Sequence, residues 1–93
     1  MIKSFKCKET QKIFRGLFSK KIPTEILKRS LIKLRSIDIA ENVDDLIIPP
    51  STNLESLDGD RKGQYSIRIN KQYRICFEWI DNNALSVEIV DYH

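Results

Sequence analysis

Residues 8–40 carry hydrophobic side chains at helical spacing. One predicted helix begins at Lys8, and its apolar face holds Ile13, Phe14, Leu17 and Phe18. A break at residues 19–23 separates it from a second predicted helix, which Thr24 caps and which runs to about Ala40. The apolar stripe of the second helix consists of Ile26, Leu27, Leu31, Leu34 and Ile37. Two amphipathic helices joined by a short connection predict a helical hairpin.

The remaining segments alternate between apolar and polar residues, which is typical of strands. Residues 1–6 predict a short first strand, residues 41–46 are compatible with a helical turn, and Pro49 and Pro50 make residues 47–53 a connector. Three strands are predicted at residues 64–69, 73–80 and 85–90, with a short strand or loop at residues 54–57 before them. The order strand, two helices and four strands predicts an α+β fold, with the helical hairpin on one face of an antiparallel sheet.

The two central strands present one apolar face and one polar face. The apolar face should pack on the helices and consists of Tyr65, Ile67, Ile69, Tyr73, Ile75, Phe77 and Trp79. A three-residue loop at residues 70–72 places Arg68 opposite Arg74, and like charges in that position destabilise a sheet. Two interpretations fit equally well. Either both side chains reach water or an acid such as Glu78, or two guanidiniums form a clamp for a phosphate.

Length and composition narrow the class of protein. The 93 residues predict a single domain, residues 1–93, and 41% hydrophobic with 31% charged residues is typical of a soluble globular protein. No apolar run approaches the ~20 residues of a membrane span, and residues 1–6 lack the apolar core of a secretion signal, so a cytoplasmic protein is expected. Two cysteines and one histidine make neither a disulfide framework nor a metal-ligand set, so no metal or cofactor is expected.

Charge is distributed unevenly along the chain. Residues 1–37 contain 11 Lys or Arg and 2 Asp or Glu, whereas residues 38–93 contain 5 and 11. This polarity predicts a basic face for a polyanion such as RNA or DNA, although basic residues on helices more often only solvate an outer surface. Along the strands, Arg68 and Lys71 are candidate RNA contacts, and Arg61 and Lys62 form a weaker basic pair in a turn.

The sequence offers few groups for acid–base chemistry. His93 is the one side chain whose ordinary pKa lies near 7, and Tyr92 precedes it. Arg74 cannot act as a base because a guanidinium does not lose its proton, so its expected role is to stabilise negative charge. Such a set suits RNA cleavage in which the 2′-hydroxyl attacks the adjacent phosphate, since that reaction needs a base, an acid and cations.

Four segments together resemble a known family. Residues 1–6, the leucine-x-x-leucine-x-glycine loop that begins at Leu54, the hairpin of residues 64–77 and the closing Asp91-Tyr92-His93 are similar to HigB-type toxins of the RelE-like superfamily, the plasmid-maintenance killer proteins. The resemblance implies a microbial-ribonuclease-like fold and metal-independent cleavage of messenger RNA on the translating ribosome. It also implies a helix-turn-helix antitoxin, HigA, which binds the toxin and represses their operon, so that operator DNA is contacted only through the antitoxin.

The resemblance also implies roles for individual residues. Arg74, Tyr92 and His93 fall on functional positions of the family, and Asn70 falls where members carry Arg or Asn. The loop departs from the family pattern, because Glu55 and Asp58 occupy places where a His and a Lys often lie.

Acids at these two places would repel phosphate. A second hypothesis is therefore a member that binds its antitoxin, with or without RNA or the ribosome, and does not cut. A third, an unrelated small RNA-binding module, is disfavoured because the polar sheet face lacks a pair of exposed aromatic residues for base stacking.

Overall fold

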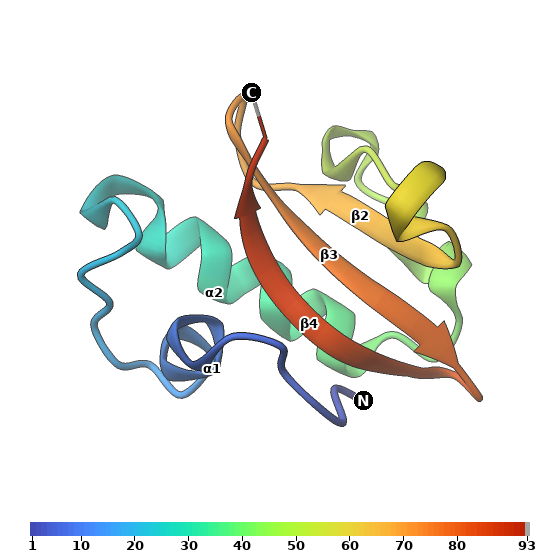
Figure 1. Ribbon diagram of the computed structural model, residues 1–93, viewed down its shortest axis with the longest axis horizontal. Helices are drawn as coiled ribbons and strands as arrows, with labels where there is room; N and C mark the ends of the chain where they lie inside the picture. Colours follow the sequence, from blue (N-terminus) through green and yellow to red (C-terminus); the bar gives the residue numbers. More distant parts are fainter. Residues whose placement is uncertain (93) are drawn as a thin grey trace.

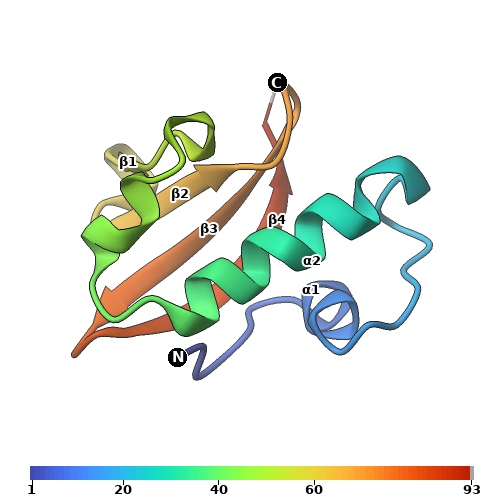
Figure 2. The same ribbon diagram turned by 180° about the vertical axis from the view of Figure 1, so that it is seen from behind.

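Two helices cover one face of a four-stranded antiparallel sheet in this computed structural model, which describes residues 1–92 (Figures 1 and 2). The helices are α1 (Lys8–Phe14) and α2 (Thr24–Ile39). The strands are β1 (Glu55–Ser56), β2 (Gln64–Arg68), β3 (Tyr73–Ile80) and β4 (Asn83–Asp91), and they neighbour one another in chain order. The predicted α+β class and the order of the last four strands are confirmed.

The core lies between α2 and the inner face of the central hairpin. Ile67, Ile75 and Phe77 are fully buried, as are Leu34 and Ile37 of α2. Successive side chains of a strand point to opposite faces of the sheet, so every second residue of the hairpin packs against the helices. The predicted register is confirmed: Ile67 pairs with Ile75, and Arg68 pairs with Arg74. Both arginines therefore start from the face of the sheet that the helices do not cover.

Two predicted helix boundaries need correction, namely the end of the first helix and the start of the second. Helix α1 ends at Phe14, because Gly16 adopts the left-handed conformation (φ +81°) that commonly terminates helices. Leu17 and Phe18 consequently do not join the core, and they are 56% and 61% exposed. Helix α2 begins at Thr24 itself, so Thr24 is the first helical residue and not the cap that was predicted.

The N-terminal segment is not the regular strand that was predicted. It pairs with the edge of β4 at two isolated points, Ile2 with Ala84 and Phe5 with Val87, and it runs parallel to β4. Between these points β4 bulges at Ser86, which has a positive φ of 53° and donates its N–H to the Ser4 hydroxyl. The bulge lets Ala84 and Val87 both face the core, and it interrupts the pairing along the edge.

The connector between α2 and β1 contains two short 3₁₀ helices, η1 (Val43–Ile47) and η2 (Pro50–Thr52). The carboxylate of Asp45 caps η1 by accepting backbone N–H groups, and these bonds lower its pKa. Lys33 of α2 donates a hydrogen bond of 2.8 Å to the hydroxyl of Thr52, which ties η2 to the helix. Within residues 1–92, no helix is long and apolar enough to cross a membrane.

Candidate active site

Arg74 lies on the sheet face opposite the helices, and fixed polar groups hold its side chain. Its Nε donates to the hydroxyl of Ser66 at 2.8 Å, and its Nη2 donates to the backbone carbonyl of Asn53 at 2.8 Å. The residue is only 9% exposed. The segment leading into β1 lies against its guanidinium, so Arg74 is largely covered although the helices leave this face of the sheet open. The hydrogen bonds orient this cation before any ligand arrives.

Glu55 is the acid nearest to Arg74. Strand β1 sets Glu55 opposite Ser66 on β2, and its Oε2 lies 3.7 Å from Arg74 Nη2. The predicted conflict between Arg68 and Arg74 is resolved by different partners, because Arg68 donates its Nε to the carbonyl of Asn70 at 3.1 Å. The acid that pairs with Arg74 is thus Glu55 and not Glu78.

Tyr92 follows β4 and lies beside the same arginine. The centre of its ring is 6.0 Å from Arg74 Cζ, within cation–π range, and the side chain is 44% exposed. A hydrogen bond from its backbone N–H to the carbonyl of Gln72 ties this end of the chain to the tip of the β2–β3 hairpin. Two of the predicted site residues are therefore neighbours. His93, the predicted proton carrier, lies outside the described residues.

Asn70 and Lys71 occupy the hairpin tip. The side-chain oxygen of Asn70 accepts the backbone N–H groups of Gln72 and Tyr73, at 2.8 and 2.7 Å. Asn70 thus has a clear structural role in the turn, which is a common use of asparagine. Lys71 is exposed at the same tip.

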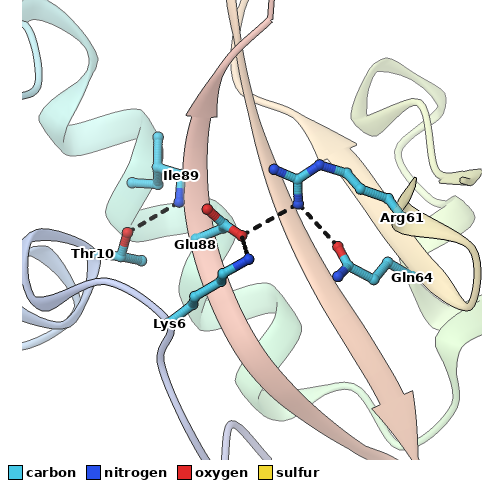
Figure 3. Close-up of polar contacts among 6 residues, drawn as sticks. All are labelled: Lys6, Thr10, Arg61, Gln64, Glu88 and Ile89. Atoms are coloured by element: carbon cyan, nitrogen blue, oxygen red, sulfur yellow. Dashed lines mark hydrogen bonds and ion pairs between the residues drawn. The ribbon is translucent and has the colours of Figure 1, made fainter. Parts of the chain in front are cut away.

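Arg61 is engaged within the protein, as Figure 3 shows. It belongs to the short helix η3 (Gly59–Arg61), and its Nη1 reaches Gln64 Oε1 at 3.1 Å and Glu88 Oε2 at 3.2 Å. Lys6 approaches the same carboxylate oxygen at 3.4 Å. Burial is the largest single effect and works against the charge of Arg61, but the hydrogen bond to Glu88 and nearby negative charge together outweigh it, so the pKa of Arg61 is raised. Arg61 therefore fastens the loop across the sheet, whereas its predicted companion Lys62 is exposed.

Cys76 lies on this face as well, fully buried. Burial raises the pKa of its thiol, so the neutral form persists at pH 7 and the side chain is a poor nucleophile. Residues 1–92 contain no cluster of His, Cys, Asp and Glu that could hold a metal ion.

Sequence reasoning missed two cations on α2. Arg29 and Lys33 lie with Arg68, Asn70 and Lys71 around one cleft at the end of β2. Burial and, to a lesser degree, the nearby Arg29 lower the pKa of Lys33. The alternating pattern of the strands could not predict the position of these two residues, because that position depends on which side of α2 faces the hairpin tip.

The fold of this chain is shared with solved toxin–antitoxin structures. YoeB from Staphylococcus aureus, in the heterotetrameric YoeB–YefM toxin–antitoxin complex, has a TM-score of 0.61 at 23% identity, over 100% of this chain and 98% of YoeB. The YoeB dimer from the same organism gives a TM-score of 0.59 at 23% identity, over 99% and 97% of the two chains. At these identities the likeness establishes a shared fold and nothing further.

Sequence similarity then identifies the family. The HigB-like family, described as the RelE-like toxin of type II toxin–antitoxin system HigB, matches residues 3–93. Toxin HigB-1 of Vibrio cholerae is 46% identical over 65 residues, which are 70% of this chain and 68% of that protein. Endoribonuclease HigB of Proteus vulgaris is 33% identical over 93 residues, the full length of both chains. This protein belongs to the HigB-like toxin family of type II toxin–antitoxin systems, and the predicted resemblance is confirmed.

Proposed function

We propose that this protein is an endoribonuclease that cleaves messenger RNA on the translating ribosome and thereby inhibits translation. The observation that carries the proposal is the fixed guanidinium of Arg74, held by Ser66 and Asn53 with the ring of Tyr92 at 6.0 Å. The full-length relative from Proteus vulgaris, named as an endoribonuclease, supports the same activity. Since translating ribosomes are cytoplasmic, the protein acts in the cytoplasm.

In the proposed reaction the RNA supplies its own nucleophile. The 2′-oxygen forms a bond to the adjacent phosphorus, the bond to the 5′-oxygen breaks, and the products carry a cyclic phosphate and a 5′-hydroxyl. A base removes the 2′-proton and an acid protonates the leaving oxygen. His93 is the candidate proton carrier and Tyr92 the second candidate, while Arg74 stabilises the charge that develops on the phosphorane. Asn70 is a weaker candidate for the catalytic set, and Arg68, Lys71 and Lys62 belong to the surrounding RNA contacts in this proposal.

The proposed partner is a HigA-type helix-turn-helix antitoxin. Membership of a type II toxin–antitoxin family implies an antitoxin, and the structurally similar YoeB forms a complex with YefM. In the proposal the toxin meets operator DNA only through this antitoxin.

One observation favours a second candidate, a member that binds its antitoxin but cleaves slowly or not at all. Glu55 lies 3.7 Å from the guanidinium of Arg74, so a phosphate that approaches Arg74 also approaches a carboxylate. The pair is exposed on the Glu55 side, at 53%, so water screens part of this repulsion.

A reconstituted translation system separates the two candidates. One message is translated in the presence of the protein, and the same message without a start codon serves as the control. The 5′ ends of the RNA are then mapped. The proposal expects new ends in the translated message alone. If neither message acquires new ends, the non-cleaving candidate replaces the nuclease.

A further inference from the structure

A cleft of about 800 Å³ opens at the end of β2, between α2, the segment around η2 and the hairpin tip. These flanking elements face the viewer in Figure 2, where α2 crosses in front of the sheet. Four cations line the cleft: Arg29 and Lys33 from α2, Arg68 from the end of β2, and Lys71 from the tip. Strand β1 pairs only with Tyr65 and Ser66, which leaves the end of β2 unpaired on this side.

Within the described residues, no recorded ion pair compensates the positive charge of this cleft. Arg29 donates to the carbonyl of Ile69 at 3.3 Å, Arg68 to that of Asn70 at 3.1 Å, and Lys33 to the hydroxyl of Thr52 at 2.8 Å. All of these acceptors are neutral. Over residues 1–92, none of the recorded ion pairs includes a cation of the cleft. Cations that are held in place without a counter-charge are suited to bind an anion.

The cleft adjoins the Arg74 site through Asn53. Asn53 lines the cleft, and its backbone carbonyl accepts the hydrogen bond from Arg74 Nη2. Its left-handed conformation, with φ 53° and ψ 55°, turns the chain at this point. A ligand in the cleft and a phosphate near Arg74 would therefore lie on either side of one residue.

We propose that this cleft binds one nucleotide of the message, next to the phosphate that reacts at Arg74. The inference rests on the proposed ribonuclease function. The phosphate lies against the guanidiniums, which offer paired donors in the geometry that phosphate oxygens accept. The amide of Asn70, oriented by its two backbone hydrogen bonds, offers its NH₂ group to a base or sugar.

A nucleotide fits these features better than an acidic protein segment. A cleft of this volume is of the size that holds a compact organic ligand, whereas a single carboxylate would fill a small part of it. Guanidinium planes also provide surfaces for base stacking, which single-stranded RNA uses and a carboxylate does not. The shared wall at Asn53 favours the message over ribosomal RNA, because a single strand can run from one site to the other.

Binding of a fluorescein-labelled single-stranded RNA hexamer to the isolated protein, followed by fluorescence anisotropy at several salt concentrations, tests the assignment. The cleft variant is Arg29→Gln with Lys71→Gln. The control variant, Arg15→Gln with Lys28→Gln, removes the same charges from exposed positions outside the cleft. Lys33 is kept because it holds Thr52. Circular dichroism verifies that both variants fold.

We expect the cleft variant to lose at least tenfold in affinity and the control less than threefold. The log–log salt slope of the cleft variant should fall by roughly 0.7 to 1.4, which corresponds to one or two phosphate contacts on a single strand. Equal losses in the two variants would overturn the assignment.

Further measurements distinguish a failure of the cleft proposal from a failure of the nuclease proposal. In one outcome, RNA binding depends on the cleft while the wild-type protein never cuts a translated message. That result supports RNA binding by the cleft and rejects the proposed nuclease activity. Cleavage by wild type with no difference between the two variants rejects the cleft alone. If poly-L-glutamate binding depends on the cleft and RNA binding does not, the occupant is an acidic protein. If only affinity for ribosomes without message depends on it, the nucleotide belongs to ribosomal RNA. Each of these last two results overturns the proposal.

Discussion

Two basic regions on the same hairpin differ in how their charge is held. The guanidinium of Arg74 is almost buried, fixed by two hydrogen bonds and paired with Glu55. Three of the four cations of the cleft, Arg29, Lys33 and Arg68, are anchored by neutral oxygens, and none of the four has a recorded carboxylate partner among residues 1–92. A cation that is held in a fixed position can stabilise the negative charge of a transition state. Cations without carboxylate partners instead attract a polyanion. This difference supports our proposals that Arg74 serves the chemistry and that the cleft binds RNA.

Both basic regions depend on the packing of the β2–β3 hairpin against the helices. Removing a buried side chain from this hairpin should therefore have the largest effect. Phe77→Ala should lower the free energy of unfolding by about 3–5 kcal/mol, because Phe77 is fully buried and the substitution leaves a cavity. Urea unfolding followed by circular dichroism measures this change. A loss below about 1 kcal/mol would mean that Phe77 does not anchor the sheet to the helices.

Removal of the Glu55 charge tests whether it restrains Arg74. Glu55→Gln should raise the rate of message cleavage, by up to about fivefold, since an exposed ion pair is worth at most about 1 kcal/mol. Asp58→Asn is the matched control, because the recorded ion pairs within residues 1–92 join Arg74 to Glu55 and not to Asp58, so the repulsion predicted for Asp58 should be the weaker of the two. Single-turnover cleavage rates in reconstituted translation provide the comparison. A fall in rate with Glu55→Gln would show that the carboxylate assists the reaction.

Arg61 and Lys62 are adjacent basic residues with different expected roles. Arg61→Gln should lower the free energy of unfolding by about 1 kcal/mol, because it removes partly exposed bonds to Glu88 and Gln64. Lys62→Gln should change stability by less than about 0.5 kcal/mol, as is usual for an exposed side chain. Thermal unfolding of both variants checks the pair. Equal changes would contradict the fastening role of Arg61.

The smallest expected effect concerns the thiols. Since burial raises the pKa of Cys76, its thiol should stay protonated and unreactive in the folded protein from pH 7 to pH 8.5. The partly exposed Cys7 should react alone with a disulfide reagent, and both should react in denaturant. Two fast-reacting thiols in the native protein would place Cys76 in contact with solvent.

Local pattern was enough to predict much of the fold. Period two and a three-residue loop were sufficient to place Arg68 opposite Arg74, because register in a hairpin depends on its turn. The error at Leu17 and Phe18 came from extending a helical pattern through Gly16, although glycine is a common helix terminator.

The contacts of Arg74 could not be predicted from the local sequence pattern. The carbonyl of Asn53 carries no side-chain signal, and Glu55 reaches Arg74 only because β1 adds to the edge of β2. The cleft likewise depends on the rotation of α2 over the sheet, which sets where Arg29 and Lys33 lie.

The register partners Arg68 and Arg74 provide the most direct test of the central claim, that Arg74 serves chemistry. Cleavage of a translated message is measured under single-turnover conditions for Arg74→Ala and Arg68→Ala, with thermal unfolding as a check that each variant folds. Arg74→Ala should reduce the rate by ~10²–10³ at saturating protein, as expected for loss of a preorganised charge. Arg68→Ala should act mainly on affinity and be overcome by added protein. Full cleavage by Arg74→Ala, or equal losses in both variants at saturation, would contradict the account.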